Sequence, residues 1–212
     1  MTYPYELTPL HLDLLKEIGN IGAGNAATSL SKLLNRKINM KVPDVKIISF
    51  DEMMEVVGGP EQVIASVFVR IQGDATGSIF FVLSPEEASK FVGEMIGDES
   101  FQFGEPPFSE LGLSAYTELG NILSGSYLSA LSDFTQLNLQ PSVPSISVDM
   151  VGAILTFGLI ELSQVADHAI LIDTILQDEK YHLEKVRGHF FLLPDPDSFQ
   201  TFFQSLGVSS NE

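Results

Sequence analysis

The sequence predicts one mixed α+β domain, built from a duplicated unit with a pseudo-twofold arrangement, in which long helices pack on a continuous β-sheet. Three observations predict this class. The chain has 212 residues, of which 44% are apolar, enough for one sizeable core. Residues 8–97 and 109–207 align with each other and repeat one order of helical and strand patterns. Because the join between them is only about a dozen residues long, residues 1–212 are expected to form a single domain.

The internal repeat is visible when Thr8 is placed over Ser109, since both are residue types that favour the N-cap of a helix. The alignment then continues without a gap as far as Pro43 and Pro144. Its matched pairs are Leu12 and Leu113, Glu17 and Glu118, Gly19 and Gly120, Asn20 and Asn121, Ile21 and Ile122, Gly24 and Gly125, and Leu30 and Leu131.

The first unit opens with a long helix over residues 10–34, where apolar residues recur on one face with small residues between them. A polar turn at 35–37 ends this helix, and Pro43 precedes a strand at 45–50. Residues 55–63 are ambiguous, because the sequence Gly-Gly-Pro within them interrupts any regular element.

The rest of the first unit predicts a hairpin followed by a helix. Strands at 65–71 and 78–83 are joined through the polar, glycine-containing residues 72–77. A Ser-Pro pair then begins an amphipathic helix at 85–96, and Gly97 ends it.

The second unit repeats this plan after an insertion. A long helix follows Ser109, and an Asp-Pro pair begins a last helix that ends at Gly207. Residues 165–168 show little periodicity and are expected to be a connection. Strands are expected near residues 145–150, 153–162, 169–176 and 189–193.

Composition excludes several classes of function. With 28 acidic and 11 basic residues, the formal net charge is −17, which argues against binding nucleic acid or an anionic membrane. The chain has no cysteine, so disulfides, thiolate metal sites and cysteine nucleophiles are excluded. Residues 1–6 lack the features of a signal peptide, and the apolar stretch 150–160 is too short to span a membrane. We therefore expect a cytoplasmic protein without membrane insertion.

Residues 22–27 imitate a dinucleotide-binding fingerprint, because they read Gly-Ala-Gly-Asn-Ala-Ala and Asp44 follows about twenty residues later. That fingerprint must follow a strand and open a helix, whereas these glycines lie inside a predicted helix. The second copy lacks the pattern. We interpret the small residues as a helix face packed closely on a neighbour.

Other familiar chemistries have no support in the sequence. No Gly-x-Ser-x-Gly elbow surrounds a serine, and no phosphate-binding P-loop is present. The four histidines are scattered without acidic clusters at metal-ligand spacing, so no metal held by the chain is predicted. They are His11, His168, His182 and His189.

Two polar stripes on the long helices remain. Asp13, Glu17 and Asn20 are spaced i, i+4 and i+7, which places them on one helix face. Such faces are usually only solvated. However, a Gly-Asn pair is costly in the middle of a helix, and it occurs in both copies. We therefore hypothesise that the asparagines have a functional role.

The spacing Asp/Ser-x3-Glu-x2-Asn-x22-Pro occurs twice. The first occurrence is Asp13, Glu17, Asn20 and Pro43, and the second is Ser114, Glu118, Asn121 and Pro144. This pattern resembles the signature of the CheC/CheX/FliY phosphatases, which dephosphorylate the chemotaxis response regulator CheY. The run 17–26 is similar to members of the CheC type, since CheX-type chains carry one motif and FliY-type chains add a flagellar switch module. The resemblance covers nearly the whole chain.

The resemblance implies a hydrolase that acts on the aspartyl phosphate of CheY. Asn20 and Asn121 would each hold an attacking water in line with the phosphorus. Glu17 and Glu118 would pair with a lysine of the regulator. The regulator is expected to supply Mg²⁺, so no cofactor is expected on this chain. In this picture the motif residues Asp13 and Ser114 are peripheral, and Pro43 and Pro144 shape the turn into the following strand.

The resemblance also implies a second partner, the receptor deamidase CheD, whose contact we expect around Asp149. A monomer is expected, because the internal repeat already supplies twofold packing. Two alternatives stay open. One is a non-enzymatic adaptor that sequesters phosphorylated CheY or CheD. The other is a motor-associated module of FliY type, which we disfavour because we expect no further domain after Glu212.

Overall fold

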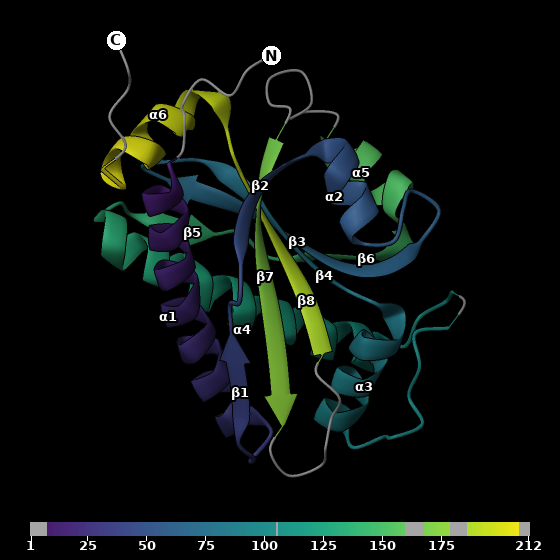
Figure 1. Ribbon diagram of the computed structural model, residues 1–212. Coiled ribbons are helices and arrows are strands. Elements are labelled where there is room, and N and C mark those ends of the chain that lie inside the picture. Colours follow the sequence, from purple (N-terminus) through teal and green to yellow (C-terminus); the bar gives the residue numbers. More distant parts are fainter. Residues whose placement is uncertain (1–7, 105, 160–167, 179–185, 208–212) are drawn as a thin grey trace.

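The structure is a computed structural model that describes residues 8–104, 106–159, 168–178 and 186–207 (Figure 1). Helices and strands alternate in the same order in each half of the chain. The first half contains α1 (Pro9–Leu33), β1 (Ile38–Lys41), β2 (Val45–Ser49), α2 (Phe50–Val56), β3 (Val63–Gly73), β4 (Gly77–Leu83) and α3 (Pro85–Ile96). The second half contains α4 (Glu110–Thr135), β5 (Leu139–Pro141), β6 (Ser145–Met150), α5 (Val151–Leu159), β7 (His168–Asp178), β8 (Val186–Pro194) and α6 (Pro196–Ser205).

All eight described strands belong to one antiparallel sheet with the order β1-β7-β8-β4-β3-β5. The two halves exchange strands, because β1 and β2 pair with β7, while β5 and β6 pair with β3. At the centre, β4 of the first half pairs with β8 of the second. The prediction of a mixed fold with a continuous sheet is confirmed. The repeated element order agrees with a duplicated unit of residues 8–97 and 109–207, which stays a proposal.

The sheet has a hydrophobic core on each face. Successive strand residues point to opposite faces, so Phe81 and Phe190 lie in one core while Phe80 and Phe191 lie in the other. The two long helices α1 and α4 pack against each other on the first face, and α2 and α5 lie on the second (Figure 1). The long helices therefore cover one face of the sheet, and α2 and α5 lie on the other.

The glycine- and alanine-rich run 22–27 lies within α1, as the sequence predicts, and not at a strand-to-helix turn. A Cβ atom added at Gly22 would lie 3.0 Å from the backbone Cα of Tyr127 in α4. Ala23 and Ala26 are buried beside it. The small residues allow α1 and α4 to cross closely, which is the packing role expected for them.

One strand prediction is wrong. Residues 153–159 of the predicted strand 153–162 belong to helix α5, and residues 160–162 lie outside the described part of the chain. The run is apolar almost throughout, so periodicity does not distinguish a buried helix from a buried strand. The helix start is fixed by tertiary contacts, because the backbone N–H groups of Val151 and Gly152 donate to carbonyls of Gln62 and Pro60.

Three smaller differences concern short segments. The structure contains the short strands β1 and β5, which the sequence pattern does not predict because each follows closely on a polar turn. The ambiguous stretch 55–63 contains the end of α2 and a turn in which Gly58 and Gly59 have positive φ. Of the expected connection 165–168, only His168 is described, and it begins β7.

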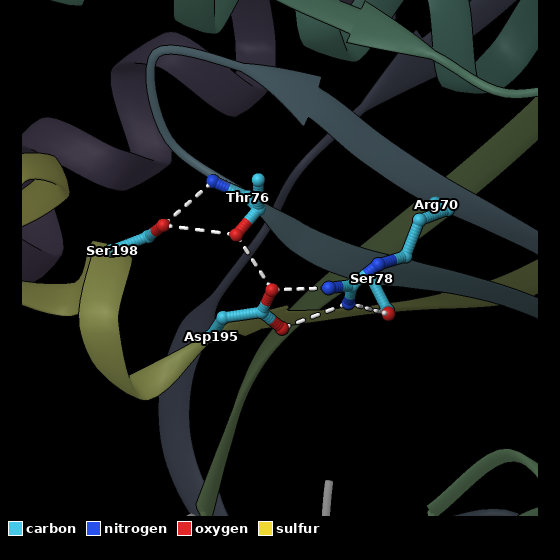
Figure 2. Close-up of polar contacts among 5 residues, drawn as sticks. All are labelled: Arg70, Thr76, Ser78, Asp195 and Ser198. Atoms are coloured by element: carbon cyan, nitrogen blue, oxygen red, sulfur yellow. Dashed lines mark hydrogen bonds and ion pairs between the residues drawn. The ribbon is translucent and has the colours of Figure 1, made fainter. Parts of the chain in front are cut away.

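A polar network joins the two halves beside α6 (Figure 2). The carboxylate of Asp195, the residue before α6, accepts hydrogen bonds from the guanidinium of Arg70 and from the hydroxyl of Thr76. Arg70 also donates to the hydroxyl of Ser78 at 3.0 Å, and the Thr76 N–H donates to Ser198 Oγ at 2.8 Å. These contacts fix the β3–β4 hairpin against the start of α6.

Candidate functional site

The motif residues lie in the first half of each of the two long helices, α1 and α4. Asp13 and Glu17 are exposed on α1, and Asn20 is half-buried on the same helix. Ser114, Glu118 and Asn121 are all exposed on α4. Within each helix, the three-residue spacing places the glutamate and the asparagine on one face. The structure therefore gives each motif a carboxylate and an amide side by side.

The glycine before each asparagine has a structural explanation. A Cβ at Gly19 would lie 3.3 Å from a methyl group of Val42, and a Cβ at Gly120 would lie 2.5 Å from a methyl group of Val67. Each glycine thus lets its helix pack closely against the rest of the fold. Close packing therefore explains why a glycine stands in the middle of each helix. It does not explain why an asparagine follows it.

The Asn20 amide is bonded within the chain. Its Oδ1 accepts from the Val42 N–H at 2.8 Å, and its Nδ2 donates to the Lys16 carbonyl at 3.0 Å and to the Val42 carbonyl at 3.4 Å. Asn20 therefore ties α1 to the connection between β1 and β2, and both ends of the amide are occupied.

The second motif is open. The side chains of Glu118 and Asn121 make no hydrogen bond or ion pair with any residue that the structure describes. Val143, which aligns with Val42 in the repeat, is 87% exposed, whereas Val42 is 2% exposed. The amide of Asn121 is consequently available to accept and donate hydrogen bonds to a ligand.

The two motif prolines lie in equivalent connections. Pro43 lies between β1 and β2, and Pro144 lies directly before β6. Each follows the valine that differs so much between the two halves. The sequence pattern identifies both prolines, but it gives no sign that the chain before them takes two different paths.

No group of three or more histidine, aspartate or glutamate side chains in the described residues could hold a metal ion. His11 is engaged at the start of α1, where its Nδ1 accepts from the Thr8 N–H at 3.0 Å. His189 Nδ1 lies 2.7 Å from a carboxylate oxygen of Asp173. No helix within these same residues is long and apolar enough to cross a membrane.

Asp149 lies on a different surface from the motifs. It is exposed near the end of β6, next to Met150, whose register partner on β3 is Val63. These two apolar side chains are 46% and 42% exposed. Asp149 lines a groove of about 390 Å³ together with residues of β3, β4, β6 and α5, among them Phe68 and Ile154. The surface combines one carboxylate with exposed apolar groups.

Comparisons with known proteins agree with these features. The model of the CheC-like family matches residues 10–47 and 111–148, which contain the two motifs. The CheY-P phosphatase CheC of Bacillus subtilis is 48% identical over 198 residues, which covers 93% of this chain and 94% of that protein.

Two solved structures share the fold. The crystal structure of Thermotoga maritima FliY has a TM-score of 0.76 at 24% identity, covering 95% of this chain and 98% of that one. CheX in the CheX–CheY–BeF3–Mg complex of Borrelia burgdorferi has a TM-score of 0.51 at 16% identity, covering 82% and 96%. At these identities the likeness shows the fold alone.

Proposed function

Since the chain belongs to the CheC-like family, we propose that it is a phosphatase that hydrolyses the aspartyl phosphate of the response regulator CheY. The observation that carries this proposal is the exposed pair Glu118 and Asn121 on one face of α4, an available carboxylate and amide with no partner among the described residues. The name of the Bacillus subtilis relative, a CheY-P phosphatase, supports the choice of substrate.

An aspartyl phosphate is an activated acyl phosphate, so its hydrolysis needs little covalent chemistry. It needs a water held in line with the phosphorus and stabilisation of charge on the phosphoryl oxygens. A carboxamide can accept a hydrogen bond from that water through its oxygen and donate one through its nitrogen. A carboxylate in that place would repel the phosphoryl oxygens, so the neutral Asn121 is the suitable group.

Glu118 serves a different step in this mechanism. It lies one turn before Asn121, so its carboxylate can pair with a lysine of the regulator while the amide enters the same cleft. That ion pair would fix the register of the helix. Mg²⁺ bound by the regulator would neutralise charge on the phosphoryl group, and no residue of this chain is assigned to it.

The test is phosphate release from Mg²⁺-loaded, phosphorylated CheY. The wild-type chain should accelerate release, and the double variant Asn20→Ala/Asn121→Ala should lose this effect. Removing one group that stabilises a transition state costs on the order of 10²-fold in rate. Binding of phosphorylated CheY without acceleration would refute the enzyme and favour an adaptor. We further propose that the protein is a cytoplasmic monomer. Size-exclusion chromatography with light scattering tests the oligomeric state.

A second proposal concerns CheD. The exposed Asp149 beside the exposed side chains of Met150 and Val63 is suited to a partner with apolar groups and a nearby cation. We expect Asp149→Lys to weaken CheD binding. Asp133→Lys makes the same charge change at an exposed position of α4 and should leave binding intact. Equal CheD affinity of the Asp149→Lys variant and the wild type would remove this assignment.

A further inference from the structure

We infer that the two motifs divide their work: Asn121 orients the attacking water, whereas Asn20 serves the fold and its site is closed by the chain's own backbone. This inference rests on the proposed phosphatase function. It starts from the contrast between two residues that the sequence makes equivalent. Asn20 is half-buried, and both the oxygen and the nitrogen of its amide make hydrogen bonds within the chain. Asn121 is exposed, and its side chain makes no hydrogen bond with any described residue.

In the first site, the backbone of Val42 occupies the same amide atoms of Asn20 that would have to bind the attacking water. Val42 presents an N–H to Oδ1 of Asn20 at 2.8 Å and a carbonyl to its Nδ2 at 3.4 Å. Nδ2 also donates to Lys16, so both of its hydrogens are engaged. Before Asn20 can hold a water in line, Val42 must give up its bonds. Because a polar group that loses its partner away from water is costly, the closed form is favoured.

The path of the chain explains why only one site is closed. In the first half, Val42 is buried and packs against Gly19, which brings its backbone to Asn20. In the second half, the connection is likewise bonded to the sheet, at Ser142, the counterpart of Lys41, which pairs with β7 in the first half. The Ser142 N–H donates to the Arg70 carbonyl at 2.8 Å, and Ser142 Oγ accepts from the Arg70 N–H at 3.0 Å.

These bonds hold the β5–β6 connection on β3. Val143, unlike Val42, is 87% exposed, and the contact that Gly19 makes with Val42 is replaced at Gly120 by Val67 of β3. The backbone before Pro144 therefore does not cover Asn121. The second amide is ready for a water, and Glu118 beside it is ready for a cation of the regulator.

The test compares single variants of the full chain in the phosphate-release assay with Mg²⁺-loaded, phosphorylated CheY. Asn121→Ala should lose on the order of 10²-fold in kcat while its melting temperature stays near that of the wild type. Asn20→Ala should retain kcat within about threefold and melt at a lower temperature, because the Val42 backbone loses its partners. An equal loss of kcat in both variants, or a larger loss at Asn20, would overturn the inference.

A second pair of variants tests which of the two motifs is active, at positions where a substitution should not disturb the fold. Glu17 and Glu118 are both exposed, so Glu17→Ala and Glu118→Ala should fold equally well. Only Glu118→Ala is expected to lower kcat/KM, mainly through KM. If Glu17→Ala lowers kcat/KM as much as Glu118→Ala, the division of labour is wrong. If the wild type itself fails to accelerate phosphate release, the proposed function is refuted instead.

NMR of the ¹⁵N-asparagine-labelled chain gives a readout besides activity. Addition of CheY activated with beryllium fluoride and Mg²⁺ should shift the side-chain amide signals of Asn121 and leave those of Asn20 in place. Shifts at Asn20 of the same size as those at Asn121 would contradict a closed first site. Asn25, exposed on α1, serves as an internal reference for nonspecific effects.

Discussion

Alanine should have opposite effects at two glycines of α4 that are only five residues apart. At Gly120, an added Cβ would lie 2.5 Å and 3.1 Å from the two methyl carbons of Val67, which is 1% exposed in the core. At Gly125, an added Cβ would have no atom within 4 Å. The backbone is helical at both positions, so the substitutions differ only in their surroundings.

The two free energies of unfolding follow from this difference. Replacing glycine by alanine inside a helix stabilises by about 0.5–1 kcal/mol, and this gain applies to both positions. Overpacking a core typically costs about 1–3 kcal/mol, and this cost applies only to Gly120→Ala. Gly125→Ala should therefore be more stable than the wild type, and Gly120→Ala less stable than Gly125→Ala by about 1–3 kcal/mol.

Thermal and urea unfolding followed by circular dichroism measure this difference. For a chain of this size, 1 kcal/mol shifts the melting temperature by about 2–4 °C, so the two variants should melt roughly 2–12 °C apart. Equal melting temperatures would show that α4 does not pack against Val67 as described. Close packing of the motif helix on the sheet would then no longer explain the glycine at position 120.

Three further predictions concern other parts of the molecule. Asp195→Ala should destabilise the fold by about 1–3 kcal/mol in urea unfolding, because the half-buried Arg70 loses its carboxylate; a smaller loss than for an ordinary exposed ion pair would contradict the network. Burial raises the pKa of Tyr116 and of Tyr127 above the ordinary value of 10.0, so stability should be unaffected by them below pH 10. It should then fall by about 1.4 kcal/mol per pH unit for each tyrosine as the pH rises above 10. Before unfolding, a tyrosinate absorbance larger than that of the three other tyrosines, Tyr3, Tyr5 and Tyr181, would disprove this burial. Finally, Glu118→Gln should raise KM for phosphorylated CheY and reduce its dependence on salt, and an unchanged salt dependence would exclude an ion pair there.

Elements with strong local signals could be predicted from the sequence. Helix α3 begins after the capping serine Ser84 and ends at Gly97 in the left-handed conformation, as the residue types indicate. The hairpin of β3 and β4 follows equally from its β-branched and aromatic residues and its polar turn. Helix α5 could not be predicted, because an apolar run is compatible with either element and contacts with Gln62 and Pro60 decide the outcome.

In the candidate site, too, the sequence predicts some features and not others. The repeated spacing locates both motifs, and the helices place Glu118 and Asn121 on one face as expected. The difference between Asn20 and Asn121 could not be predicted, because it depends on where Val42 and Val143 lie, 22 residues further along each copy. Local patterns contain no information on such a tertiary path.

The most direct measurement is the number of phosphorylated CheY molecules that one chain dephosphorylates. With about one chain per hundred regulators, Mg²⁺ and a continuing phosphate assay, we expect the wild type to accelerate release until the whole pool is consumed. The double variant Asn20→Ala/Asn121→Ala should leave the spontaneous rate unchanged. Acceleration that requires a stoichiometric amount of the chain, or that persists in the double variant, would contradict catalysis by an asparagine of the motifs.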